Sequence, residues 1–118
     1  LQSSLAMMAL ATNPLYAEPR KKARFRFQLW RHATLFVEVN KLNILVDPML
    51  SAKDTMNPIP NAANSLRIPM VELPFNEVEL KKKLATVNAI LLTHLHTDHW
   101  DVRVRDLLNK EIPIICQP

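Results

Sequence analysis

Hydrophobic and polar residues follow two different periods along the chain. The run RFRFQL at residues 24–29 alternates strictly between polar and apolar positions. Because successive side chains of a strand point to opposite faces, this alternation predicts a half-buried β-strand. Residues 33–39 and 42–46 are rich in β-branched and aliphatic side chains and predict two more strands. Asn40 and Lys41 predict a hairpin turn between them, and Asp47-Pro48 ends the third strand because proline cannot continue a ladder.

A helical period begins at residue 76 and places apolar residues at 80, 84 and 87 on one face. Asn76 can cap this helix, and Glu79 three residues later completes the spacing of a capping box. Two acid–base pairs, Glu77 with Lys81 and Glu79 with Lys83, have the i,i+4 spacing of helical ion pairs. The three consecutive lysines therefore read as a solvated helix face.

The remaining segments complete an alternation of strands and helices. Residues 89–92 form a short apolar run that predicts a strand covered on both faces. Residues 104–108 predict a short helix, and residues 113–116 predict a further buried strand. Residues 48–74 hold five prolines and no clear period, which predicts a long loop of the kind that forms a lid or pocket wall. The order of elements predicts a layered α/β architecture.

Composition adds one unusual constraint: among 118 residues there are nine prolines and no glycine. Tight turns need residues that tolerate a positive φ angle, and asparagine is the best substitute for glycine. The turns are therefore expected to rest on the asparagines, which are Asn13, Asn40, Asn43, Asn57, Asn61, Asn64, Asn76, Asn88 and Asn109.

The net charge of +4 is concentrated in one stretch that contains no acidic residue. A flexible arm or a solvated strand face is the favoured interpretation of this stretch, and binding to nucleic-acid phosphates is the less favoured one. The basic residues of the stretch are Arg20, Lys21, Lys22, Arg24, Arg26 and Arg31.

Residues 1–23 are expected to be a leader or flexible arm. Residues 5–12 resemble the apolar part of a secretory signal, and an N-terminal helix docked on the core is the alternative. A cytoplasmic location is favoured, with a periplasmic or secreted one if residues 1–17 are a signal remnant. No apolar run reaches the length of a membrane span, and the single cysteine, Cys116, excludes an internal disulfide.

Three of the four histidines fall within the segment THLHTDHWD at residues 93–101. If the preceding strand continues in extended form, His94, His96 and Asp98 point to one face. His99 joins them only if the backbone turns sharply. The cluster follows a buried strand, where open α/β sheets place their sites. Imidazole and carboxylate suit Zn²⁺, with Mn²⁺ or Fe²⁺ as alternatives. Surface histidines on a loop are the competing interpretation.

The same residues match the pattern His-x-His-x-Asp-His, and the sequence resembles the metallo-β-lactamase superfamily there. Residues 29–39 and 44–51 resemble the branch of ascorbate-phosphate lactonase-like and N-acyl-phosphatidylethanolamine phospholipase D-like hydrolases. The resemblance covers residues 24–118 and implies an αβ/βα sandwich with a two-metal site at one edge. His94 and His96 would bind one metal ion, and Asp98 and His99 the other.

The resemblance also implies roles for residues near the ligands. Asp98 would act in catalysis by orienting a metal-bound hydroxide. Asp47 would orient a ligating histidine, although an Asp before Pro is also an ordinary strand end. His32 would line the pocket or serve as a hydrogen-bonded structural histidine. Arg31 and Lys41 stand where this branch favours glycine.

Members of the family are longer, and their remaining ligands, two histidines and a bridging aspartate, come later in the chain. No histidine follows His99, so the chain is expected to hold four of seven ligand positions and the N-terminal half of the sandwich.

The leading hypothesis is a hydrolase that uses metal-bound hydroxide on a small-molecule or lipid-like ester, lactone or phosphoester. The 118 residues by themselves are expected to be weakly active or inactive. A truncated relative that binds metal or a partner without catalysis is one alternative, and its exposed half-sandwich would need an oligomer or a second chain. A nuclease of the same superfamily is the other.

Overall fold

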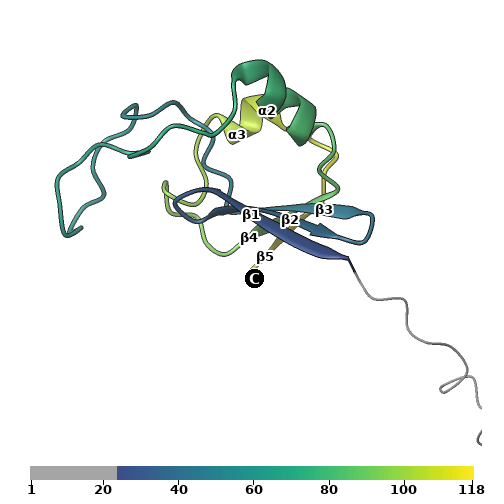
Figure 1. The fold of residues 1–118 in the computed structure, drawn as a ribbon. Coiled ribbons are helices and arrows are strands. Elements are labelled where there is room, and N and C mark those ends of the chain that lie inside the picture. The colour runs from purple at the N-terminus through teal and green to yellow at the C-terminus, as the bar shows by residue number, and fades with distance from the viewer. Residues whose placement is uncertain (1–23) are drawn as a thin grey trace, which may run out of the picture.

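The computed structural model describes residues 24–118, and its centre is one five-stranded sheet with both helices on the same side (Figure 1). The predicted leader, residues 1–23, lies outside the described residues. The strands lie in the order β1-β2-β3-β4-β5 across the sheet. The elements are β1 (Phe25–Arg31), β2 (Thr34–Val39), β3 (Leu42–Val46), α2 (Glu77–Leu84), β4 (Ala89–Leu92), α3 (Val104–Leu107) and β5 (Ile114–Cys116).

The sheet is mixed, and its two halves follow from how the strands are connected. Strands β1, β2 and β3 form an antiparallel meander, and the turn at Asn40 and Lys41 is where the sequence predicts it. Strands β4 and β5 run parallel to β3, since each is reached by a crossover that carries a helix. The predicted α/β layering is confirmed.

Helix α2 begins as the sequence predicts. The Asn76 side chain accepts a hydrogen bond from the Glu79 backbone N–H, and the Glu79 carboxylate accepts one from the Asn76 N–H. Lys81 forms the expected ion pair with Glu77 at 3.6 Å. The second expected pair does not form among the described residues. Glu79 caps the helix instead, and Lys83 Nζ lies 4.8 Å from the centroid of the Phe75 ring.

The core lies between the sheet and the helices. Trp30, Phe36, Leu45 and Ile90 project from the strands and are buried against α2 and α3. The Trp30 and Phe36 rings stack with centroids 5.3 Å apart. Phe36, Leu45 and Ile90 are register partners on adjacent strands, and the two-residue period of each strand places their sequence neighbours on the opposite side of the sheet.

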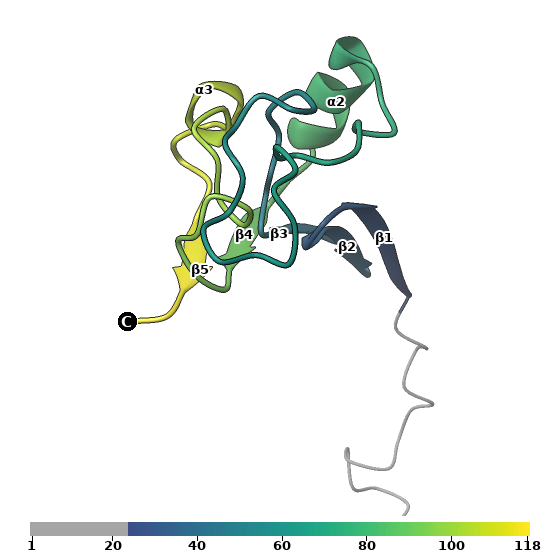
Figure 2. The same ribbon diagram turned by 90° about the vertical axis from the view of Figure 1, so that its left-hand side faces the viewer.

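The opposite side of the sheet is apolar, and its residues are exposed or half-buried. The strand pairing brings only hydrophobic residues to it, and none of them is charged. Phe27 is 66% exposed, Leu91 39% and Ile115 55%. The predictions that β4 is covered on both faces and that β5 is buried are therefore wrong for the described residues. Figure 2 shows both helices on the other side of the sheet. We call this surface the apolar face; its residues are Phe25, Phe27, Leu29, Leu35, Val37, Val39, Leu42, Ile44, Val46, Ala89, Leu91 and Ile115.

Turns without glycine rest on asparagine, aspartate and histidine. Of the eight asparagines that lie within the described residues, only Asn40 and Asn61 have positive φ angles, 56° and 63°, so the prediction that the asparagines carry the turns holds for these two alone. His32, Asp47 and Asp54 also have positive φ angles, which the composition does not single out. Asparagine and aspartate tolerate this region best because their short polar side chains bond locally to the backbone.

The three described basic residues of the stretch, Arg24, Arg26 and Arg31, do not all lie on one exposed surface. Arg31 is only 2% exposed, and Arg26 pairs with Glu38 at 3.3 Å. Residues 20–22 lie outside the described part of the chain. Among the described helices, none is long and apolar enough to cross a membrane.

Candidate metal centre

The histidine-rich segment begins where β4 ends. The chain leaves the sheet after Leu92 and turns back on itself at residues 97–99. The backbone N–H groups of His99 and Trp100 both donate to the His96 carbonyl at 2.9 Å. This is the sharp turn that His99 needs in order to lie beside the other histidines. The segment therefore lies at the carboxyl ends of the parallel strands β3 and β4.

The three imidazole rings lie together. The ring centroids of His94 and His96 are 4.5 Å apart, and those of His94 and His99 are 3.9 Å apart. Asp98 Oδ2 lies 3.5 Å from His99 Nε2. The four residues that the motif singles out are thus near neighbours, and His94 and His96 are more exposed than Asp98 and His99.

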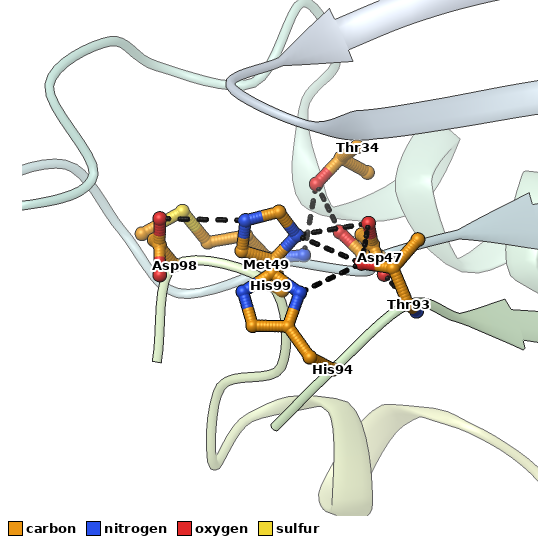
Figure 3. Close-up of polar contacts among 7 residues, drawn as sticks. All are labelled: Thr34, Asp47, Met49, Thr93, His94, Asp98 and His99. Atoms are coloured by element: carbon orange, nitrogen blue, oxygen red, sulfur yellow. Dashed lines mark hydrogen bonds and ion pairs between the residues drawn. The ribbon is translucent and has the colours of Figure 1, made fainter. Parts of the chain in front are cut away.

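Asp47 is buried beside this cluster at the end of β3 (Figure 3). Its Oδ1 accepts a hydrogen bond from the Thr93 backbone N–H at 2.8 Å. Its Oδ2 lies 2.8 Å from both the Thr93 hydroxyl and His99 Nδ1. Burial by itself would raise the pKa of Asp47, but the hydrogen bonds from Thr93 and His99 outweigh it and hold this pKa below its usual value.

The backbone around Asp47 is held in an uncommon conformation. Its φ angle is 43°, in the left-handed region that few non-glycine residues occupy. The buried hydroxyl of Thr34 donates to the Asp47 carbonyl at 2.7 Å and accepts from the Met49 N–H at 3.0 Å. This bridge fixes the exit from β3 and so sets the direction of the Asp47 carboxylate.

The types of donor in the cluster suit a divalent cation. Because its Nδ1 is bonded to Asp47, His99 turns Nε2 toward the Asp98 carboxylate, and these two groups face each other without a hydrogen bond between them. A cation or a proton between them would satisfy both. Among residues 24–118, no three His, Cys, Asp or Glu side chains are arranged to enclose a metal ion. The donor types suit a metal ion, and the four side chains lie close together, but their described arrangement does not itself enclose an ion.

His32 lies in the turn between β1 and β2 and holds the long loop. Its Nε2 accepts a hydrogen bond from the Met70 backbone N–H at 2.9 Å. Burial lowers the pKa of His32, the neighbouring Arg31 charge lowers it further, and Asp98 opposes the shift. Of the two roles considered for His32, the structure shows the hydrogen-bonded one.

Acidification is expected to destabilise the fold through His32. Its pKa is lower in the folded chain than the ordinary 6.5, so the unfolded chain binds a proton at higher pH than the folded chain does. Neutral His32 therefore contributes fully to stability above about pH 6.5. This contribution is lost as the pH falls toward and through the pKa that His32 has in the folded chain. Urea unfolding at pH 7.5 and 5.5 measures this effect: the free energy of unfolding should fall more between the two pH values for the wild type than for His32→Gln. Equal losses would contradict this role.

Three residues at the site carry roles that the motif does not reveal. Thr93 bonds to Asp47, as described above. Asp101 is buried, and its carboxylate accepts hydrogen bonds from the N–H groups of Ser51, Arg103 and Val104. The sequence could have pointed to this role of Asp101, because an aspartate three residues before Val104 has the spacing of a helix cap. Nothing in the sequence indicates the role of Arg31, because its neighbours in the chain suggest an exposed basic stretch.

Arg31 fastens the start of the long loop to the sheet. Its guanidinium donates to the carbonyl of Met49 at 2.9 and 2.7 Å, to Ser51, and to Val71 at 3.1 Å. Burial lowers the pKa of Arg31 to about 10, against the opposing charges of Asp101 and Glu72. It remains protonated at neutral pH. Both ends of the loop, residues 48–74, are therefore tied to Arg31 at the end of β1.

Sequence comparison agrees with this geometry. The sequence profile of the metallo-beta-lactamase superfamily matches residues 29–100. The chain belongs to this superfamily. It is also 35% identical over 88 residues to UPF0173 protein YddR of Bacillus subtilis (strain 168), an alignment that covers 74% of this chain and 34% of YddR.

Two solved structures are similar to the chain. One is described as a possible metal-dependent hydrolase from Veillonella parvula DSM 2008, with 33% identity and a TM-score of 0.71. The other is isothiocyanate hydrolase from Delia radicum gut bacteria, with 36% identity and a TM-score of 0.69. Each match covers 78% of this chain and 34% of the other protein. The chain spans about one third of the length of these relatives and has the fold of the N-terminal part of a metallo-β-lactamase domain.

Proposed function

We propose that residues 24–118 are the N-terminal, metal-binding part of a metal-dependent hydrolase. His94, His96, Asp98 and His99 would be the metal ligands, with Zn²⁺ as the expected ion and Mn²⁺ or Fe²⁺ as alternatives. The observation that carries the proposal is the bond from His99 Nδ1 to buried Asp47. Metal-ligating histidines commonly bond to a carboxylate in this way, which fixes the ring and leaves Nε2 for the metal.

The expected reaction is hydrolysis of a small-molecule or lipid-like ester, lactone or phosphoester. A bound cation would polarise the substrate and lower the pKa of water to about 7. The chain's own residues would orient the donors: Asp47 holds His99, and Asp98 faces His99 Nε2. The similar protein named isothiocyanate hydrolase supports attack by water on an electrophilic carbon. Of the described residues in the basic stretch, Arg31 is buried and Arg26 is paired with Glu38, which leaves Arg24 exposed; a nuclease is therefore the less favoured function.

Zinc binding by the 118-residue chain tests this function. We expect calorimetric titration with zinc chloride to show binding that Asp98→Ala weakens at least about tenfold, since the change removes a ligand. Asp106→Ala, which removes an exposed carboxylate outside the cluster, should bind as the wild type does. Hydrolysis of a lactone or a phosphodiester by the 118 residues should be weak or absent. Equal zinc affinity in the wild type and Asp98→Ala would contradict the ligand assignment.

The apolar face supports a second candidate role, in which the chain acts by associating with further polypeptide. Contiguous apolar patches on monomers rarely exceed about 300–600 Å², and this one extends across all five strands. The removal of such a surface from water is favourable by about 25 cal/mol per Å². Either a second copy or a separate sheet with an apolar side would complete a sandwich.

Light scattering on the purified chain measures this association. We expect a mass above 13.6 kDa for the wild type and a shift toward the monomer for Phe27→Lys, which places a charge on the apolar face at the edge strand β1. Val78→Lys, a charge added at an exposed apolar position on α2, is the matched control and should not change the mass. A monomeric wild type would count against association of this chain with itself.

A further inference from the structure

The side chain of Thr93 connects the groups of the histidine cluster to Asp47. Its hydroxyl oxygen lies 2.8 Å from Asp47 Oδ2, 2.9 Å from His94 Nδ1 and 3.4 Å from His99 Nδ1 (Figure 3). Thr93 stands between the last residue of β4 and the first histidine of the motif. A hydroxyl so placed has one hydrogen to donate and lone pairs with which to accept, so its partners determine one another's hydrogen positions.

Hydrogen-bond counting settles these positions. The ionised carboxylate of Asp47 can only accept, so His99 Nδ1 carries a hydrogen and donates it. The Thr93 hydroxyl likewise donates its only hydrogen to Asp47 Oδ2. Toward His94 the Thr93 oxygen can then only accept, which requires a hydrogen on His94 Nδ1 as well. Both histidines therefore have the hydrogen on Nδ1.

We propose that Thr93 is a positioning residue that fixes the tautomer of His94, so that His94 offers its Nε2 lone pair to a metal ion. A neutral imidazole with its hydrogen on Nδ1 keeps the free lone pair on Nε2. Asp47 imposes the same tautomer on His99 directly, and on His94 it acts through the Thr93 hydroxyl. One buried carboxylate thus sets the donor atom of two histidines.

The metal-binding part of this inference rests on the proposed function, whereas the tautomer of His94 does not. Thr93→Val removes the hydroxyl and keeps the branched shape, and Thr93→Ser keeps the hydroxyl. Thr93 is exposed, so Thr93→Val costs little packing. Thr97→Val makes the same chemical change at another exposed threonine within the motif and is the matched control.

Long-range ¹H–¹⁵N spectra of the metal-free chain at pH 8 distinguish the protonated ring nitrogen of each histidine. His94 should carry its hydrogen on Nδ1 in the wild type, in Thr93→Ser and in Thr97→Val. In Thr93→Val, His94 should shift toward the Nε2–H tautomer that an unconstrained imidazole prefers. His99, bonded to Asp47, should stay unchanged in every variant, and so should His32, whose Nε2 accepts from Met70. An unchanged His94 tautomer in Thr93→Val would overturn the proposal.

Titration with zinc chloride then measures the consequence for binding. Thr93→Val should bind zinc about 10–100-fold more weakly than the wild type, the usual effect of removing a group that orients a ligating histidine. Thr93→Ser and Thr97→Val should bind as the wild type does. A changed tautomer with unaltered zinc affinity would overturn the positioning role. A changed tautomer with no zinc binding by the wild type would support the Thr93–His94 bond and overturn the proposed function.

Discussion

Replacing Arg31 by methionine is expected to lower the free energy of unfolding by about 3 kcal/mol, because it leaves buried carbonyl groups without a donor. Methionine keeps much of the length of the side chain and removes the guanidinium. The carbonyls of Met49, Ser51 and Val71 then lose their hydrogen bonds. Urea unfolding followed by circular dichroism measures the change. We also expect faster proteolysis within residues 48–74, since both ends of this loop depend on Arg31.

Arg26→Met is the matched control for Arg31→Met. Arg26 lies on the same strand, and its ion pair with Glu38 is exposed. Exposed ion pairs contribute about 0–1 kcal/mol, so this variant should unfold close to the wild type. If both variants lost the same stability, the buried hydrogen bonds of Arg31 could not be the cause.

Replacing Asp47 by asparagine is expected to weaken zinc binding by about 10–100-fold while the fold is retained. Asparagine has the same size and tolerates the positive φ angle at this position. Its amide offers one accepting oxygen where the carboxylate offers two, so it cannot accept from the Thr93 N–H, the Thr93 hydroxyl and His99 as the carboxylate does. His99 would lose its fixed tautomer. Calorimetric zinc titration measures the affinity, and circular dichroism measures the fold.

Asp54→Asn makes the same substitution at another aspartate with a positive φ angle, 58°. Asp54 is exposed, and its carboxylate lies 3.8 Å from Lys53 Nζ. This variant should bind zinc as the wild type does. Equal weakening in both variants would assign the effect to charge or to turn geometry, and would contradict the orienting role of Asp47.

The structure joins the site to the fold through the exit of β3. Thr34 fixes the backbone on either side of Asp47, Arg31 fastens the residues that follow, and Asp101 binds the Ser51 N–H from the far end of the histidine segment. A change in any of these three residues would therefore reach the histidines through Asp47. The donors at the site are held by a buried polar frame, which is how a preorganised site is supported.

Local chemistry in the sequence is enough to locate most elements and the cluster itself. The three strands before residue 47, the capping box at Asn76 and the helix after the motif all depend on residues close together in the chain. The spacing of His94, His96, Asp98 and His99 likewise indicates a cluster. The turn at residues 97–99 brings them together through bonds within four residues. Local propensity and spacing decide features of this kind.

The tertiary structure decided which surfaces are covered and which polar groups meet. Alternation in β1 shows that the strand has two different faces, but the apolar Phe25 and Phe27 are exposed and Trp30 is buried, because the helices pack on the other side. Arg31 reads as part of a basic stretch, yet it is buried against carbonyls up to 40 residues away. Asp47 and His99 are 52 residues apart in the chain. Contacts over such separations depend on how the layers pack, and the local sequence carries no record of that.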